Sequence, residues 1–495
     1  MAAALMLTSV LTSAYTAYAD DTEDGTLTYE EALQASYDII PDTNQIEGWP
    51  QGPQVYGNSA IVMDMDSGAV LYEKKADDRH YPASITKILT ALVALENSQP
   101  EDEVYFSDDS VSFLEYGDAS IGMRPGEILT RKDAMYGMLL ASANEVSYAI
   151  AENVGKEMGG DYQTFIQAMN DRAQELGCTG SHWVNANGLH DEQHYTTARD
   201  MALIASAVYQ FEEFRTVTQT LEYTIGTTNL VNETRTFQQN HKMLWPGSYY
   251  YYESCTGGKT GYTDQSRTTL VTMAENNGLR LAAVILQDDG DVYIDTRAMF
   301  DYAYSSFTKT LLSDQEKPDE VLAYDDADAY VLLPAGVEFS SLESEITVTD
   351  EKKAEGTVTY YYEGQNVGSA DVTLTEEALA GKAEDAQTPQ SDAADGTAQK
   401  AEKDPQQETA AILTRMLTCA GVAIFVLIVF LLMLLRYRIV KQRRRRMAMA
   451  RRRQRIQNSG RSADWRSERP AGTQRRQMRS GREEHGVRDR NGRYR

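Results

Sequence analysis

A run of twenty residues without a charge, 416–435, divides this chain into two parts of opposite charge. The segment after it holds 22 Lys and Arg against 5 Asp and Glu, a net of +17, so residues 1–435 carry −44 of the total of −27. Twenty apolar residues span a bilayer core as one helix, and basic residues on one flank place that flank in the cytoplasm. The sequence therefore predicts a single-pass protein of the cell membrane, with a transmembrane helix at 416–435, a basic cytoplasmic tail at 436–495 and the acidic bulk outside.

The segments near the two ends of the acidic part agree with this topology. Residues 2–19 are small and apolar and end in Ala17-Tyr18-Ala19, a cleavage pattern of signal peptides, although the basic residues that usually open such a peptide are missing. We therefore predict a signal peptide at 1–19, followed by an acidic leader at 20–52. Residues 377–415 are rich in Ala, Glu, Asp, Gln and Lys, a composition that buries no core, and predict a flexible stalk.

Periodicity in the remaining sequence predicts two folded parts. Residues 53–314 begin with strands 58–65 and 69–73 and carry strands 270–274 and 281–286 near their end, each pair around a polar turn. Helices are expected between and after these strands, at 84–96, 131–154, 161–176, 197–209 and 295–311. This order favours an α+β fold, one antiparallel sheet flanked by helices. Residues 318–376 show short alternating strands without helices and predict a small all-β domain.

The first helix of the larger part carries a serine and a lysine that suit nucleophilic catalysis. Ser84 and Lys87 are three residues apart, so they share one face of the first helical turn. A lysine pressed into the apolar run Ile88–Leu95 loses hydration, which favours its neutral form as a base for the serine. Alone, however, S-x-x-K is more often a helix cap followed by a surface lysine.

Two further polar clusters follow at distances of about sixty and a hundred and fifteen residues. Ser142-Ala143-Asn144 stands just after an apolar run, and Lys259-Thr260-Gly261 follows two glycines ahead of a predicted strand. A lysine on an edge strand, with a glycine that lets backbone come close, is suited to bind a carboxylate. Each cluster by itself is weak, because small polar triplets and solvated lysines are common.

In this order the three clusters resemble those of the low-molecular-mass penicillin-binding proteins, the serine-type D-Ala-D-Ala carboxypeptidases. The resemblance covers about residues 58–312 and implies a penicillin-binding/β-lactamase-like fold, with a serine carboxypeptidase domain at 53–314. It extends to the stretches Tyr81–Lys87, Ala143–Glu145, Asn187–Leu189, His194–Ala198 and Gly258–Thr263. Family members often have Gly where Ala143 stands and Asp where Glu145 stands, and neither change removes a catalytic group.

The resemblance assigns the reacting groups to the first two clusters. Ser84 would be the acylated nucleophile and Lys87 its general base. Ser142 would relay a proton to the leaving D-alanine and also touch Lys87. Asn144 would orient Lys87 and the substrate amide.

The resemblance assigns substrate binding to the third cluster. Lys259 would bind the terminal carboxylate and keep Lys87 neutral by repulsion between like charges. Thr260 would hydrogen-bond the same carboxylate. Gly261 and Thr263 complete the substrate-binding stretch, and the N–H groups of Ser84 and Tyr262 would form the oxyanion hole.

The expected activity is removal of the terminal D-alanine from the pentapeptide of peptidoglycan, with β-lactam antibiotics as inhibitors and no metal or organic cofactor. A β-lactamase is the nearest alternative, although no E-x-x-L-N segment lies between Ser142 and Lys259. A membrane-anchored scaffold with an inactive ectodomain is an alternative of another class. His190 and His194 do not form H-E-x-x-H, and no G-x-S-x-G elbow occurs, which disfavours zinc and Ser-His-Asp chemistry.

Two features remain beside this function. The arginine-rich tail favours contact with anionic lipid over nucleic acid, because few aromatic residues are interleaved with its basic residues. Of the three cysteines, Cys419 lies in the apolar run. Cys178 and Cys255 are expected as free thiols, although a bridge between them outside the cell stays open.

Overall fold

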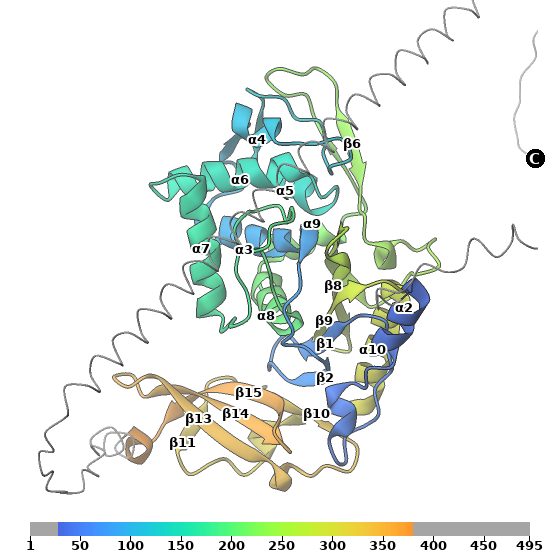
Figure 1. Ribbon diagram of the computed structural model, residues 1–495. Coiled ribbons are helices and arrows are strands. Elements are labelled where there is room, and N and C mark those ends of the chain that lie inside the picture. Colours follow the sequence, from blue (N-terminus) through green and yellow to red (C-terminus); the bar gives the residue numbers. More distant parts are fainter. Residues whose placement is uncertain (1–27, 380–495) are drawn as a thin grey trace, which may run out of the picture. The chain divides into compact units, whose positions relative to one another are not determined.

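A five-stranded antiparallel sheet organises the computed structural model, which describes residues 28–379 (Figure 1). The strand order is β2-β1-β9-β8-β7, so strands from both ends of the domain meet at its centre, where Ile61 pairs with Val284. The strand bounds are β1 (Ser59–Asp64), β2 (Val70–Lys74), β7 (Cys255–Thr263), β8 (Arg267–Asn276) and β9 (Leu279–Asp288). Strand β7 is an edge of this sheet, which leaves one side of its backbone open to a cleft.

Helices cover both faces of this sheet. Helix α10 packs against β8 and β9 on one face of the sheet. On the other face, α8 packs against β1 and β9, and helices α3 and α9 pack against α8. The helices on the α8 side form one buried apolar cluster, and α3 contributes Ile88, Leu89, Leu92 and Val93 to it, all of which are buried. The helices are α2 (Tyr29–Tyr37), α3 (Lys87–Asn97), α4 (Asp108–Ser112), α5 (Arg131–Leu139), α6 (Asn144–Glu157), α7 (Tyr162–Glu175), α8 (Ala198–Tyr209), α9 (Glu212–Gln219) and α10 (Val292–Ser306).

Short elements join these layers. Two small hairpin-like ladders pair β3 (Glu103–Tyr105) with β4 (Ile128–Thr130), and β5 (Glu222–Ile225) with β6 (Arg235–Gln238). Single 3-10 turns are η1 (Asp42–Gln45), η2 (Ala83–Thr86), η3 (Lys242–Leu244), η4 (Leu312–Asp314) and η5 (Phe339–Ser341). The described α+β arrangement, an antiparallel sheet flanked by helices, confirms the coarse fold class expected from the sequence.

The strands after residue 306 form two further sheets (Figure 1). One pairs β10 (Phe307–Leu311) with β12 (Tyr330–Pro334), and the other has the order β11-β15-β14-β13. The bounds of the latter are β11 (Val321–Tyr324), β13 (Glu343–Asp350), β14 (Glu355–Tyr362) and β15 (Gln365–Leu374). Their buried side chains belong to the same apolar cluster as those of β1, β2 and α10. These strands therefore share a core with the main sheet instead of enclosing one of their own.

Two helices expected from the sequence end differently in the structure. The helix expected at 131–154 is broken between Leu139 and Asn144, because Ser142 adopts a left-handed φ of 62°. The helix expected at 295–311 ends at Ser306, and residues 307–311 instead pair with β12. In both places a tertiary partner overrides the local helical periodicity.

The described part of the acidic leader, from Thr28 onward, contains helix α2 and the 3-10 turn η1. Helix α2 begins with a capping box in which Thr28 and Glu31 satisfy each other's backbone N–H groups. Downstream of it, Trp49 is buried against Phe307 and Tyr362, and the Tyr302 hydroxyl donates to the Pro50 carbonyl. Residues 41–56 thus form a strap across the apolar cluster shared by the main sheet and the C-terminal strands.

Several sequence predictions fall outside the described residues. They are the signal peptide at 1–19, the first residues of the leader, most of the stalk, the transmembrane helix at 416–435 and the basic tail at 436–495. Within residues 28–379, no helix combines the length and apolar character needed to cross a bilayer. Cys178 and Cys255, the two cysteines in this part of the chain, are both free thiols.

Candidate active site

Ser84 and Lys87 lie where the 3-10 turn η2 passes into helix α3. Ala83, just before the serine, adopts a left-handed φ of 52°, a conformation that L-residues hold only when their surroundings enforce it. Thr86 provides one such constraint, because its hydroxyl donates to the Ala83 carbonyl at 2.8 Å. The turn leaves Ser84 half-buried while Lys87 is completely buried one turn later.

The ammonium position of Lys87 has three neighbours. Its Nζ lies 3.0 Å from Ser84 Oγ, 2.8 Å from Asn144 Oδ1 and 2.6 Å from the Asn187 carbonyl oxygen. The last two atoms are acceptors only, so they occupy two N–H bonds. A neutral amine has two N–H bonds and one lone pair, so its lone pair faces the serine hydroxyl. The geometry therefore suits a base that receives the Ser84 proton.

Electrostatics favour this neutral form. Burial is the largest cause that holds the pKa of Lys87 well below its ordinary value, and the nearby Lys259 lowers it further. The carboxylates of Glu145 and Asp118 act in the opposite direction and raise the pKa of Lys87. Burial and Lys259 are the two causes expected from the sequence for a neutral Lys87, and both are present, with burial the larger.

The second cluster stands at the break between α5 and α6. Asn144 opens α6, its side chain points to Lys87, and its N–H donates to the Ala119 carbonyl at 2.8 Å. Ser142 is buried two residues earlier, at its left-handed φ. The hydrogen bonds of Lys87 in the described structure go to Ser84, Asn144 and Asn187, and a hydrogen bond to Ser142 is not among them.

The third cluster lies on edge strand β7. Lys259 is buried, which lowers its pKa to about 7, and its Nζ donates to the Thr260 carbonyl at 2.7 Å. At Gly261 the strand passes so close to η2 that a Cβ would lie 3.0 Å from the Ser84 nitrogen and 2.3 Å from Thr269 Oγ1. Thr269 in turn donates to the Pro82 carbonyl at 2.8 Å. Glycine at this position therefore lets the strand and the serine share one site.

A cleft of about 580 Å³ opens over Ser84. Lys87, Lys259 and Thr260 are not part of its lining. Tyr262 and Thr263 continue β7 along the rim of the cleft. The lining residues are Ser84, Tyr116, Gly117, Asp118, Ala119, Asn144, Asn187, Gly188, Leu189, Tyr262, Thr263 and Asp264.

The loop at 185–194 supplies groups to the site that its motifs do not predict. The Asn187 carbonyl binds Lys87, and a backbone carbonyl has no side-chain signature by which a motif could reveal it. The sequence signal was Gly188, which adopts a φ of 84° and packs against the backbone of Ala83. A Cβ there would lie 1.9 Å from the Ala83 oxygen, so only glycine lets this loop approach the nucleophile.

His194 anchors the same loop to η2. Its Nε2 lies 2.8 Å from Thr86 Oγ1, and its Nδ1 accepts from the Val184 N–H at 3.1 Å. Since the Thr86 hydroxyl proton already points to Ala83, Nε2 must be the donor, which describes a neutral imidazole. Burial lowers the pKa of His194 to about 3, which agrees with a neutral imidazole. Both ring nitrogens are occupied, so His194 holds the loop in place and is not free to bind zinc.

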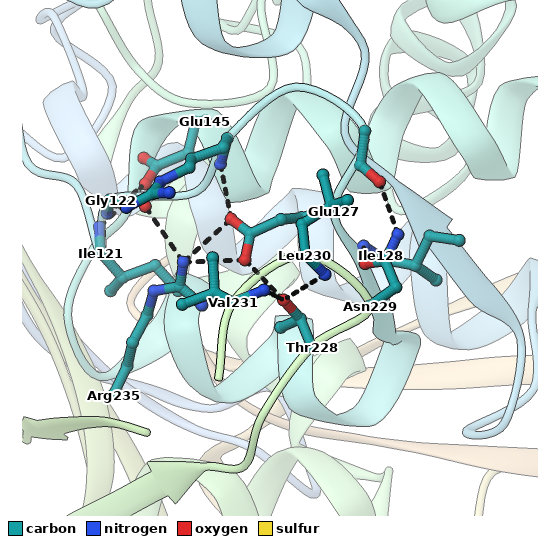
Figure 2. A network of polar contacts seen from close by, with 12 residues as sticks. Ile121, Gly122, Glu127, Ile128, Glu145, Thr228, Asn229, Leu230, Val231 and Arg235 are labelled. Carbon is teal, nitrogen blue, oxygen red and sulfur yellow. Dashed lines mark hydrogen bonds and ion pairs between the residues drawn. The ribbon is translucent and has the colours of Figure 1, made fainter. Parts of the chain in front are cut away.

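A buried carboxylate, that of Glu145, holds the backbone at Ile121 and Gly122 (Figure 2). This turn follows the wall of the cleft formed by residues 116–119. Glu145, completely inaccessible, accepts hydrogen bonds at one oxygen from the Ser120 hydroxyl and the N–H groups of Ile121 and Gly122, at 2.6, 2.8 and 3.2 Å. Glu145 follows Asn144 on α6, so one helix start places both the lysine partner and the wall. Charge-assisted bonds of this kind are stronger than neutral ones.

Arg235 extends this network to a second carboxylate (Figure 2). Its guanidinium lies 2.9 Å from both oxygens of the buried Glu127 and donates to the Gly122 carbonyl at 3.2 Å. The Thr228 hydroxyl also donates to Glu127, at 2.7 Å. The loop between β5 and β6 is thereby tied to the turn at 120–127, which gives the cleft wall support from two sides.

We expect Glu145→Gln to shift the pH dependence of acylation. Because the Glu145 charge raises the pKa of Lys87, its removal lowers that pKa, and the basic form of Lys87 is then present at lower pH. The rising limb of acylation rate against pH should move to lower pH. Rates of labelling by a fluorescent penicillin, measured from pH 4 to 9, test this shift.

Glu145→Ala provides the companion measurement. It leaves the donors of Ser120, Ile121 and Gly122 without their acceptor, which should lower the free energy of unfolding by about 2 kcal/mol. If the role of Glu145 is purely structural, Glu145→Ala will be less stable than the wild type, and the pH profile of acylation in Glu145→Gln will not change.

Comparison with known proteins agrees with this geometry. Residues 47–290 match the family model described as D-alanyl-D-alanine carboxypeptidase. The chain is 31% identical over 261 residues to the D-alanyl-D-alanine carboxypeptidase DacF of Bacillus subtilis, an alignment that covers 50% of this chain and 62% of that protein. It is 24% identical over 362 residues to DacA of Haemophilus influenzae, covering 65% of this chain and 85% of the relative.

A solved structure is also similar. The Streptomyces K15 DD-transpeptidase aligns with a TM-score of 0.47 and 25% identity, over 52% of this chain and the whole of that one. The family match covers all three polar clusters that meet around Ser84. Over residues 47–290, just under half of its length, the chain matches the D-alanyl-D-alanine carboxypeptidase family model.

Proposed function

We propose that this chain is a serine-type D-Ala-D-Ala carboxypeptidase that removes the terminal D-alanine from peptidoglycan stem peptides through an acyl-enzyme on Ser84. The observation that carries the proposal is the arrangement around Lys87. Asn144 Oδ1 and the Asn187 carbonyl accept hydrogen bonds from the Lys87 amine, and the pKa of Lys87 is lowered. The lone pair of Lys87 Nζ then faces Ser84 Oγ at 3.0 Å. A buried amine of this kind activates a serine without histidine.

The reaction follows from the groups around the cleft. Lys87 takes the Ser84 proton while Oγ attacks the carbonyl carbon between the two D-alanines, forming a C–O bond. The C–N bond then breaks, and the proton held by Lys87 passes to the leaving amine, with Ser142 as our candidate relay. Water hydrolyses the ester, which returns Ser84 to its free form and releases the shortened peptide.

Substrate position follows from strand β7. Lys259, when protonated, would attract the terminal carboxylate, and Thr260 would donate a hydrogen bond to it. The close approach of Gly261 to η2 sets the Ser84 and Tyr262 N–H groups as the proposed oxyanion hole. The same carboxylate and carbonyl geometry would accept the carboxylate and lactam carbonyl of a penicillin.

The location of the protein is a further part of this proposal. The uncharged run at 416–435 and the basic residues after it support a single-pass anchor in the cell membrane, with the catalytic part outside. The C-terminal strands and the stalk would then hold the cleft away from the bilayer, and the basic tail would contact anionic lipid on the cytoplasmic side.

The test compares the wild-type chain with Ser84→Ala. We expect a fluorescent penicillin to label the wild-type chain covalently. We also expect the wild-type chain to release D-alanine from an N-acetylated L-Lys-D-Ala-D-Ala peptide. Ser84→Ala should show neither, while it keeps the wild-type melting temperature. Lack of label on a folded wild-type chain would overturn the proposal and favour an inactive scaffold.

The lifetime of the penicillin adduct separates this activity from that of a β-lactamase. Deacylation by a β-lactamase uses a glutamate that positions water, whereas the carboxylates that line this cleft within residues 28–379 are aspartates, Asp118 and Asp264. We expect the adduct to persist for minutes or longer, well beyond the turnover time of about 0.1 s of a median enzyme. Mass spectrometry after mixing measures this lifetime.

A further inference from the structure

The Asn187 carbonyl, which accepts the shortest hydrogen bond of Lys87, belongs to a peptide unit that is also held from its other side. That unit contains the Gly188 N–H, which donates to Asn185 Oδ1 at 2.7 Å. In a planar trans peptide, the N–H and the C=O point in opposite directions. Asn185 and Lys87 therefore contact the two ends of one peptide unit, and fixing its N–H also fixes the direction of its carbonyl.

The Asn185 side chain makes two further contacts with the same loop. Its Oδ1 also accepts from the Asn187 N–H at 3.3 Å, and its Nδ2 donates to the Leu189 carbonyl at 2.9 Å. Because the two N–H groups need an acceptor and the carbonyl needs a donor, the carboxamide has one orientation. A single half-buried side chain thus ties together main-chain groups of residues 187–189.

Ala186, the residue between the two asparagines, is held on both of its polar main-chain groups. Its N–H donates to the Tyr162 hydroxyl at 3.1 Å, and its carbonyl accepts from Thr90 Oγ1 at 2.7 Å. Thr90 is completely buried on α3, one turn after Lys87. Tyr162 opens α7 and stacks on Tyr148, with 4.2 Å between the ring centroids. The loop is therefore fixed against the helix that carries the base.

We propose that Asn185 is a positioning residue of the reaction, because it orients and polarises the Asn187 carbonyl that holds Lys87. A hydrogen bond that the Gly188 N–H donates makes the carbonyl of the same peptide unit a stronger acceptor. The carbonyl then holds one N–H of the Lys87 amine, which leaves the lone pair directed at Ser84. The inference rests on the proposed function, in which Lys87 is the base.

Asn185→Ala removes the acceptor that holds this peptide unit. We expect the plateau rate of acylation at high pH to fall about tenfold, less than a full misplacement of a catalytic group would cost, because Ala186 stays held. A displaced carbonyl stabilises the ammonium form of Lys87 less, so the rising limb of acylation rate against pH should move to lower pH. Labelling of the full chain by a fluorescent penicillin, measured from pH 4 to 9, gives both quantities.

Asn185→Asp provides the rescue, because a carboxylate still accepts from the Asn187 and Gly188 N–H groups. The lost hydrogen bond to Leu189 is the remaining difference, so the plateau rate should return to within about threefold of the wild type. The new charge favours the ammonium form of Lys87, so the limb should move to higher pH, opposite to the shift in the alanine variant. If the role of Asn185 is purely structural, both variants will melt at a lower temperature, and the limb will not move in either.

Asn44→Ala is the matched control for the loss of an asparagine that ties a loop. Asn44 holds Gly52 in the strap at 41–56, with its Oδ1 accepting from the Gly52 N–H at 2.6 Å and its Nδ2 donating to the Gly52 carbonyl at 3.1 Å, and it does not line the cleft. This variant should be less stable and keep the plateau rate and the limb of the wild type. Should Asn185→Ala fail to fold, Tyr162→Phe removes only the acceptor of the Ala186 N–H, and its plateau rate should fall about threefold.

The outcomes separate the positioning role from the activity. A folded Asn185→Ala chain with the plateau rate and the pH limb of the wild type would overturn the positioning role, while labelling of the wild type would still support the carboxypeptidase. A lower plateau in the alanine variant, with opposite shifts of the limb in the alanine and aspartate variants, supports the role. If the folded wild-type chain is not labelled, both inferences fall.

Discussion

Lys87→Met will lower the rate of penicillin acylation of Ser84 by about 10³-fold or more. Methionine fills a similar volume but has no lone pair of comparable basicity, so the Ser84 proton has no acceptor at the 3.0 Å position. General-base catalysis contributes 10²–10⁴-fold, and a nucleophile and its base act as one unit. The measurement is the second-order rate constant of labelling by a fluorescent penicillin at pH 7.

Stability provides the control for this variant. Lys87→Met leaves Asn144 Oδ1 and the Asn187 carbonyl without a donor, which costs about 1–3 kcal/mol for each acceptor, and it removes an amine from a fully buried site. Thermal unfolding of the variant must show a folded chain before the rate is interpreted. A folded Lys87→Met chain that acylates within tenfold of the wild type would mean that another group is the base.

Gly188→Ala will lower the acylation rate by about 100-fold or more. The new Cβ would lie 1.9 Å from the Ala83 oxygen and 2.9 Å from the Ser84 nitrogen, and both atoms belong to the backbone. Either η2 or the loop must move, and a displacement of about 1 Å at a catalytic site is enough for a loss of this size. The same labelling assay measures it.

Gly177→Ala is the matched control for backbone strain. Gly177 has nearly the same left-handed φ as Gly188, 82° against 84°, but a Cβ there would meet nothing within 4 Å. Both variants should lose about 1–2 kcal/mol of stability from the strained backbone. Only Gly188→Ala should also lose acylation. Equal rates for the two variants would show that the loop does not position the serine.

The sequence could reveal those parts of the site that side chains encode locally. The spacing of Ser84 and Lys87 predicts only that both lie on one helical turn. This prediction holds, although Ser84 lies in the 3-10 turn η2 and Lys87 is the first residue of α3. The apolar face of α3 and the turns at 66–68 and 276–278 are similarly local. Resemblance to a family supplied the link between the three clusters, which periodicity alone does not contain.

The rest depends on contacts between distant segments. The Asn187 carbonyl reaches Lys87 across one hundred positions, and main-chain atoms are the same in every residue. In the sequence, Glu145 differs from the family only as a Glu in place of the usual Asp. In the structure, its buried carboxylate accepts hydrogen bonds from residues 120–122 and holds the turn that follows the wall of the cleft. The break at Ser142 is also imposed by tertiary packing, because the residues around it are compatible with a continuous helix.

The strap at 41–56 has a consequence for how the chain matures. Trp49 packs against Phe307 and Tyr362, and Tyr362 follows it by roughly three hundred positions. During synthesis, the strap is therefore made long before the strand that completes its packing. Closing so long a loop is slow, and an apolar surface stays open in the interval. A fragment that stops before β13 would retain every residue of the cleft and yet expose the indole on a surface that water can reach, inviting aggregation.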